Sequence, residues 1–237
     1  MHLDTDFQGK KVLVVGAGVS GFAAAKILKR LGAKVTLSDA KSEDAIGEDF
    51  SKLRALGIEL VFGAQEEALL DGCSLLLLSP AVPIAIPLAS AAKRRGIRIT
   101  SEVELAASLA RSPIFAVTGT NGKTTTTTLL GLLLAERFGK EKTRVGGNIG
   151  YPLLEAVLEA GEGGAVAAEI SSYQMEATEH FRPKAAAVLN VTPDHIKRHG
   201  SMEVYQAMKE RLFRAEQAGD FLILNYDDER TRDMKHR

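Results

Sequence analysis

The sequence predicts an α/β protein made of two consecutive units, each built around a mostly parallel sheet. Three observations support this fold class. Short apolar runs alternate with helix-like segments along the chain, these runs lack polar alternation, and each half opens with a glycine-rich turn. Continuous apolar runs are typical of parallel strands that helices cover on both faces. At about 150 residues per domain, the 237 residues suit one domain and a substantial second piece.

The first unit is expected over residues 1–110. Its strands are expected where short apolar runs occur, at 12–15, 34–38, 58–62, 75–79 and 97–100. Helices are expected between them, for example at 21–31 and 87–95, where apolar residues recur at helical spacing. The pattern breaks at 110–113, where a proline follows arginine and serine.

The second unit is expected over residues 111–237. Strands are expected at 114–118, 165–170, 185–191 and 221–224, with helices between them. A helix is expected at 202–217 because Val204, Met208 and Leu212 recur every four residues. Lys209 flanks that apolar stripe, where a lysine usually extends its ammonium into water, so the residue pattern by itself favours a structural role.

Composition excludes several classes of protein. Thirty basic and thirty acidic residues cancel to zero net charge, so the chain lacks the basic footprint of a nucleic-acid binder. The single cysteine, Cys73, excludes an intramolecular disulfide and a cysteine-rich zinc site. No apolar run approaches the ~20 residues of a membrane span. The first residues carry two acids and no apolar signal core, so we expect a cytoplasmic protein.

The first glycine-rich turn has the pattern G-x-G-x-x-G. Gly16, Gly18 and Gly21 follow a predicted strand and lead into a predicted helix, an arrangement that brings a pyrophosphate close to a helix N-terminus. Asp39 ends the next strand 18 residues later, where an acid often meets a ribose hydroxyl. The pattern therefore predicts a nucleotide or a similar ligand, with a purely structural turn as the alternative.

The second glycine-rich turn precedes a lysine and a hydroxyl. Gly119, Gly122, Lys123 and Thr124 follow a predicted strand and open a helix, as in loops that surround a triphosphate. Val117 stands where the strict phosphate-loop pattern has its first glycine. The backbone N–H groups, the lysine and the threonine hydroxyl still supply the chemistry for ATP and Mg²⁺.

Polar residues also follow two later strands. Glu169 ends an otherwise apolar run, where a carboxylate needs a partner or a metal unless it lies on an exposed edge strand. Asn190 and His195 follow the next run. Ligands of open α/β sheets gather at the carboxyl ends of strands, so we expect these residues to converge with Gly119. For His199 a structural and a functional role remain equally open.

Four motifs in order resemble the Mur ligase family. They are GTNGKTT at 119–125, GGNIG at 146–150, EISSYQME at 169–176 and NVTPDHIKRHGSMEVYQAMK at 190–209. The likeness extends from about residue 10 to the end. It implies a Rossmann-like domain for the UDP end of the substrate at 1–110 and a P-loop ATPase-like central domain at 111–237. It also implies that this central domain is incomplete, that the family's third, amino-acid-binding domain is absent, and that the chain is inactive alone.

The resemblance further implies an activity and a set of ligands. The motifs at 169–176 and 194–205 are most similar to members that add D-glutamate to UDP-N-acetylmuramoyl-L-alanine, using ATP and Mg²⁺, during peptidoglycan precursor synthesis. It implies a monomer with no nucleic-acid partner.

The resemblance also assigns roles to residues of this sequence. Catalytic roles fall to Lys123, His195 and Lys209; ATP binding to Gly119, Thr120, Asn121, Gly122, Lys123, Thr124 and Thr125; UDP-substrate binding to Gly16, Gly18, Val19, Ser20, Asp39, Ser79, Pro80 and Asn148; and metal binding to Thr124, Glu169, His195 and a carbamylated Lys209. Carbamylation replaces the cation, which cannot bind Mg²⁺, with an anionic oxygen ligand.

Two positions depart from the family pattern. Ala81 stands where the family often has glycine, so a backbone with positive φ there would be strained. Lys197 stands where aspartate is common.

Three alternative functions remain open. A nicotinamide-dependent oxidoreductase would use the first glycine loop but leave Lys123 and Glu169 without a role. A non-catalytic nucleotide-binding fragment would need no complete site. A folate-polyglutamate synthase-like ligase would not use a Rossmann-like domain at 10–110.

Overall fold

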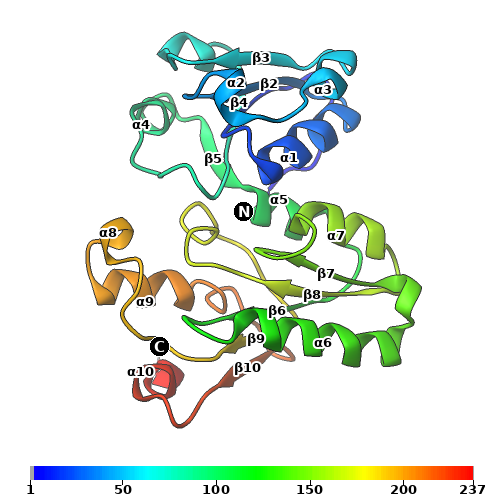
Figure 1. Ribbon diagram of the computed structural model, residues 1–237, viewed down its shortest axis with the longest axis vertical. Helices are drawn as coiled ribbons and strands as arrows, with labels where there is room; N and C mark the ends of the chain where they lie inside the picture. Colours follow the sequence, from blue (N-terminus) through cyan, green and yellow to red (C-terminus); the bar gives the residue numbers. More distant parts are fainter. Residues whose placement is uncertain (1–2, 237) are drawn as a thin grey trace. The chain divides into compact units, whose positions relative to one another are not determined.

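The computed structural model describes residues 3–236, which form two compact units. The first comprises residues 3–105 and the second residues 106–236, with the boundary inside helix α5 (Glu102–Leu109). Both units combine a parallel five-stranded sheet with helices (Figure 1). The α/β prediction is confirmed.

The sheet of the first unit has the strand order β3-β2-β1-β4-β5. Its strands are β1 (Lys11–Val15), β2 (Lys34–Asp39), β3 (Glu59–Phe62), β4 (Cys73–Leu78) and β5 (Arg98–Ser101). All of the pairings are parallel. The five strands expected from apolar runs are therefore present, with bounds shifted by a residue or two.

The central strands of this sheet are buried because they are apolar on both faces. Leu13 and Val15 of β1 form a core cluster with Leu76 and Leu78 of β4, and α4 supplies small residues to it. The helical elements are α1 (Val19–Arg30), α2 (Glu43–Ile46), α3 (Ser51–Ala55), η1 (Glu67–Leu70) and α4 (Pro87–Arg94). This packing fixes the carboxyl ends of β1, β2 and β4, from which the first glycine loop and its neighbours project.

The sheet of the second unit has the strand order β10-β9-β6-β8-β7. Its strands are β6 (Ile114–Thr118), β7 (Thr143–Gly147), β8 (Ala165–Glu169), β9 (Ala185–Val188) and β10 (Phe221–Leu224). Strand β7 was not predicted. Its sequence, TRVGG, has a single large apolar residue, and the strand forms because its glycines allow close packing. A Cβ on Gly146 would lie 2.8 Å from Ala156.

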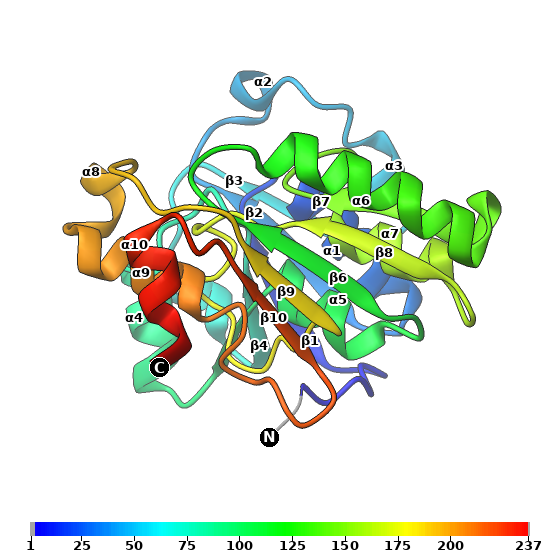
Figure 2. The same cartoon turned by 90° about the horizontal axis from the view of Figure 1, so that it is seen from below.

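The helical elements of the second unit are α6 (Lys123–Phe138), η2 (Lys140–Lys142), α7 (Leu153–Ala160), α8 (Ile196–His199), α9 (Met202–Glu210), α10 (Glu229–Asp233) and η3 (Met234–His236). Figure 2 shows α6 lying across the sheet. Among the helices formed by residues 3–236, we find none with the length and apolar character that a membrane crossing needs.

The prediction for the helix at 202–217 was wrong in length and only partly right about its buried side. Helix α9 ends at Glu210, and the chain continues in tight turns. Val204, taken from the sequence as part of the core stripe, is 43% exposed. The buried face instead carries Tyr205 and Lys209, both 1% exposed. Leu212, just beyond the helix, is buried as the stripe predicted, and polar partners described below hold Tyr205 and Lys209 inside the unit.

One face of the second sheet is apolar but only partly covered. The register pairs Phe221 of β10 with Ala185 of β9, and Ala185 with Phe115 of β6. Phe115 packs against α6, so all three residues lie on the face that α6 covers. Phe221 is nevertheless 62% exposed and Ile223 52% exposed. Helix α6 covers the β7–β8 side of this face and leaves the β10 side open.

Candidate nucleotide site

The three glycines of the first loop differ in what the protein requires of them. Gly16 has φ +99°, and a Cβ on it would lie 2.6 Å from the Cβ of Ser79. A Cβ on Gly21 would lie 1.8 Å from the carbonyl oxygen of Gly16. Gly18 has an ordinary extended backbone, and a Cβ there would meet no atom within 4 Å. Folding therefore requires Gly16 and Gly21, whereas Gly18 leaves space for a ligand.

Residues beside this loop hold its shape. The Asp39 carboxylate accepts hydrogen bonds from Ala17 N at 2.8 Å and from Lys41 N at 2.9 Å. Ser79 is buried, and its N–H donates to Val15 O at 2.9 Å. Val19, at the start of α1, is 66% exposed. Gly16, Gly18, Asp39 and Ser79 thus lie at the carboxyl edge of one sheet.

The alanine that departs from the family pattern fits its loop without strain. Among the described residues, His195 is the only non-glycine with positive φ. Ala81 therefore adopts an ordinary backbone conformation, and the strain that a left-handed alanine would bring is not present.

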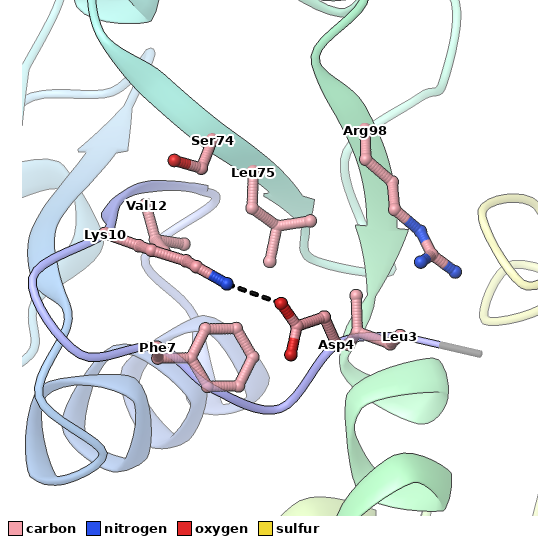
Figure 3. Close-up of a pocket in the computed structure, with 8 residues that line it drawn as sticks. All are labelled: Leu3, Asp4, Phe7, Lys10, Val12, Ser74, Leu75 and Arg98. Atoms are coloured by element: carbon pink, nitrogen blue, oxygen red, sulfur yellow. Dashed lines mark hydrogen bonds and ion pairs between the residues drawn. The ribbon is translucent and has the colours of Figure 1, made fainter. Parts of the chain in front are cut away.

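A small pocket of about 150 Å³ lies at the opposite, amino edge of the first sheet. Figure 3 shows Phe7 and Leu75 lining it beside the ion pair of Lys10 and Asp4, whose atoms are 2.6 Å apart. Val12 and Ser74, near the starts of β1 and β4, also line it. This pocket is therefore separate from the glycine loop, which follows the end of β1.

The second glycine loop connects β6 to α6 and bends around the lysine side chain. Gly122 has φ +81° and caps α6. Lys123 Nζ donates to Gly119 O at 3.0 Å and to Thr120 O at 2.8 Å. The ammonium is therefore held over the loop, beside the N-terminal end of a 16-residue helix whose dipole favours anions.

Glu169 links the start of α6 to the loop that follows β7. Its carboxylate accepts from Thr124 Oγ1 at 2.8 Å and from Asn148 Nδ2 at 2.8 Å. Glu169 O also accepts from Asn148 N at 2.8 Å. The glutamate is 1% exposed, which excludes the alternative of an exposed edge-strand residue. Thr124, Asn148 and Glu169, which the sequence placed in three separate motifs, form one cluster.

Lys209 is buried, contrary to the expectation that it extends into water. Its Nζ donates to Gly119 O at 2.7 Å and lies 4.4 Å from the centre of the Tyr205 ring. Burial, and next the charge of Lys123, lower the pKa of Lys209 to about 7. Two lysines therefore meet at one carbonyl of the glycine loop, a contact across 90 residues that local spacing does not reveal.

The two histidines of the 190–209 motif have different environments. His195 has φ 53°, its side chain is 46% exposed, and its Nδ1 lies 3.2 Å from Tyr173 OH. The His199 ring is buried, with Nε2 3.0 Å from Ser172 Oγ, and burial lowers the pKa of His199. His199 therefore has a structural environment, whereas the side chain of His195 is accessible.

Two further residues complete the loop network. Tyr205 OH lies 3.1 Å from Thr120 Oγ1 and the ring underlies Lys209. Asn190 binds the backbone of the glycine loop. Asn190 was expected to converge with Gly119 because it follows a strand, and its side chain binds the two residues after that glycine. Tyr205 was not singled out, because the apolar stripe expected from the sequence, Val204, Met208 and Leu212, does not include it.

A lysine and a hydroxyl at the start of a helix, after a strand and a glycine loop, define a P-loop-like nucleotide-binding protein. The family model described as the Mur ligase middle domain matches residues 117–237. The model for the N-terminal domain of MurD-like Mur ligases matches residues 10–101. The chain belongs to the Mur ligase family.

Three curated relatives carry the name UDP-N-acetylmuramoylalanine–D-glutamate ligase. The protein of Thermoanaerobacter pseudethanolicus is 44% identical over 98% of this chain and 51% of its own length. The protein of Pelotomaculum thermopropionicum is 47% identical over 94% of this chain and 49% of its own length. The protein of Myxococcus xanthus is 46% identical over 93% of this chain and 48% of its own length. The chain thus spans about half the length of the relatives it matches.

Solved structures show the same fold. A UDP-N-acetylmuramate:L-alanyl-γ-D-glutamyl-meso-diaminopimelate ligase from Neisseria meningitides aligns with a TM-score of 0.64 and 20% identity, over 96% of this chain and 75% of that one. UDP-N-acetylmuramate-alanine ligase MurC from Thermotoga maritima aligns with a TM-score of 0.53 and 23% identity, over 95% of this chain and 51% of that one. At these identities the likeness concerns the fold alone.

Proposed function

We propose that this chain supplies the ATP site and the UDP-substrate site of a ligase that adds D-glutamate to UDP-N-acetylmuramoyl-L-alanine. The observation that carries the proposal is the cluster around the second glycine loop, where Lys123, Thr124 and Glu169 meet at the start of α6. The curated relatives support the choice of substrate through their names. The proposal includes a cytoplasmic, monomeric enzyme.

The proposal divides the work between the two units. Residues 1–110 hold the UDP end, through Gly16, Gly18, Val19, Ser20, Asp39, Ser79 and Pro80. Residues 111–237 hold ATP, with Asn148 assigned to the sugar-diphosphate region. The open space at Gly18 supports the first assignment, and the α6 N-terminus supports the second.

The donor set at Thr124 and Glu169 fits Mg²⁺. This ion prefers hard oxygen ligands and is usually held by one or two carboxylates together with substrate phosphates. A threonine hydroxyl and a glutamate carboxylate lie 2.8 Å apart beside the loop. When bound, the ion would neutralise charge on the transferring phosphoryl group. Among residues 3–236, no group of three or more His, Cys, Asp or Glu side chains is arranged for a metal. The proposed set includes only two side chains of these types, Glu169 and His195, beside the Thr124 hydroxyl and a carbamylated Lys209.

The proposed reaction has two steps. An oxygen of the substrate's terminal L-alanine carboxylate attacks the γ-phosphorus of ATP, which forms an acyl phosphate and releases ADP. The amine of D-glutamate then attacks the acyl carbon, phosphate leaves, and the amide forms with loss of a proton. The ammonium group of Lys123 moves from the loop carbonyls to the β- and γ-phosphate oxygens of ATP. The backbone N–H groups at the start of α6 orient the phosphates.

Lys209 is proposed to act as a carbamate rather than as a cation. The side chain is buried, and its Nζ donates a hydrogen bond to Gly119 O of the second glycine loop. A neutral amine is the form that adds to carbon dioxide, and burial beside Lys123 favours that form. The carbamate would be anionic and would pair with Lys123, removing the repulsion between the two ammonium groups. Mass spectrometry of protein kept in bicarbonate should show an added CO₂ that Lys209→Met lacks.

Binding of a fluorescent ATP analogue, with Mg²⁺ present, tests the proposed function. We expect Lys123→Ala to weaken binding by roughly 10- to 100-fold, because a charge-assisted contact of about 1.5–3 kcal/mol is lost. Lys140→Ala is the matched control, since Lys140 is exposed just beyond α6. Equal affinity of the parent and Lys123→Ala would contradict the assignment. Saturable NADH binding at the first loop, without UDP-substrate binding, would instead favour an oxidoreductase.

A further inference from the structure

We infer that Asn190 is a positioning residue that divides the second glycine loop into a half held by the protein and a half left for phosphate. The inference rests on the proposed function, in that the phosphate belongs to ATP. It assigns the N–H groups of Thr120 and Asn121 to the protein and those at the start of α6 to the nucleotide.

The side chain of Asn190 binds the loop at three points. Its Oδ1 accepts from Thr120 N at 3.1 Å and from Asn121 N at 2.9 Å. Its Nδ2 donates to Asn121 O at 3.0 Å. The Asn190 backbone carbonyl also accepts from Thr120 N at 2.9 Å. Successive backbone N–H groups that point at one oxygen form the kind of concavity that binds anions. Here a neutral amide oxygen occupies it.

The side chains of the same half of the loop are also bound within the protein. Thr120 Oγ1 donates to Thr192 O at 3.1 Å, accepts from Thr192 N at 3.0 Å and lies 3.1 Å from Tyr205 OH. Asn121 Nδ2 lies 3.4 Å from Thr192 Oγ1. The segment that follows β9 therefore holds residues 120 and 121 through both backbone and side chains.

The other half of the loop differs. Gly122 caps α6 without a side-chain partner, and the first N–H groups of an α-helix have no partner within the helix. Lys123 and Thr124 belong to this half and carry the cation and the hydroxyl that phosphate and Mg²⁺ need. The phosphates are thus received at residues 122–125, and Asn190 fixes the turn that aims those residues.

An asparagine suits this position better than either obvious substitute. Aspartate would keep the acceptor for both N–H groups but would lose the donor to Asn121 O and add negative charge beside the phosphates. Alanine would remove all three side-chain contacts. The two variants therefore separate loop order from charge.

Amide hydrogen exchange and nucleotide binding together test the inference on the whole chain. In the parent without nucleotide, the amides of Thr120 and Asn121 should be protected. Asn190→Ala should speed exchange of the Asn121 amide by at least about tenfold, corresponding to about 1.4 kcal/mol, and weaken binding of the fluorescent ATP analogue by a similar factor. The Thr120 amide should change less, because it keeps its bond to the Asn190 backbone carbonyl. Asn190→Asp should keep the protection but still weaken nucleotide binding.

Asn225→Ala is the matched control. Asn225 Nδ2 donates to Leu189 O at 2.9 Å, so this side chain also binds the segment after β9 but does not reach the loop. The control should change neither measurement. Unprotected amides in the parent, or unchanged exchange of the Asn121 amide in Asn190→Ala, would overturn the inference. Loss of ATP binding by the parent itself would refute the proposed function, while the exchange data would still decide the role of Asn190 in the loop.

Discussion

Alanine substitutions at two glycines of the first loop should separate folding from substrate binding. In Gly21→Ala, the new Cβ would lie 1.8 Å from the carbonyl oxygen of Gly16, so backbone must move. Such overpacking costs up to about 3 kcal/mol, of which the better helix propensity of alanine offsets about 1 kcal/mol. The net loss is about 2 kcal/mol. For a unit of this size that corresponds to a fall in Tm of roughly 8–16 °C.

Gly18→Ala should behave in the opposite way. Gly18 has φ −75° and ψ −175°, which alanine adopts readily, and its Cβ would meet no protein atom within 4 Å. As an N-cap, alanine is somewhat poorer than glycine, so the stability loss stays below about 1 kcal/mol. The methyl group would occupy the space proposed for the diphosphate. Affinity for UDP-N-acetylmuramoyl-L-alanine should therefore fall about tenfold or more.

Thermal unfolding followed by circular dichroism, and calorimetric titration with the UDP substrate, measure the two effects. The reasoning predicts a large change in Tm with Gly21→Ala and a large change in affinity with Gly18→Ala. Equal losses of stability in the two variants would refute the packing argument. Full substrate affinity in Gly18→Ala would refute the role assigned to that space.

Three further predictions concern the second unit. Because the pKa of Lys209 is lowered to about 7 in the folded protein, the unfolded chain binds more protons between about pH 7 and 10. Stability should therefore rise with pH in that range, by at most about 1.4 kcal/mol per pH unit, and Lys209→Met should abolish this rise in bicarbonate-free urea titrations. Leu132→Ala, at a side chain 63% exposed, should change stability by less than about 0.5 kcal/mol, whereas Leu134→Ala, at a buried one, should cost about 2–5 kcal/mol. Glu169→Gln should weaken Mg²⁺-dependent ATP binding about tenfold and change Mg²⁺-free binding little; equal weakening in both conditions would contradict a metal role.

Much of the fold follows from local sequence patterns. Short apolar runs located every strand but β7, and the glycine loops were located because each follows a strand and opens a helix. Strand β7 was missed because its stability comes from glycines that let α7 approach, a tertiary effect. Its Gly146, for example, leaves no room for a Cβ beside Ala156 of α7.

The site was predictable where residues follow strands and unpredictable where helices supply them. Glu169 lies at the end of a buried strand, so its position at the carboxyl edge follows from the strand itself. Lys209 and Tyr205 lie on α9 beside the predicted apolar stripe, so the spacing of that stripe did not indicate that they are buried. Their burial results from hydrogen bonds to Gly119 O and Thr120 Oγ1, partners 85 to 90 residues away in the chain. Only the family resemblance pointed to Lys209.

The central claim is that ATP places its phosphates at the start of α6. Amide chemical shifts of the isotope-labelled chain, followed during titration with ATP and Mg²⁺, measure this most directly. We predict that the largest shifts occur at Gly122, Lys123, Thr124 and Thr125, and that they disappear in Lys123→Ala. Saturable shifts centred on residues 16–21, with the amides of 122–125 unmoved, would contradict the account.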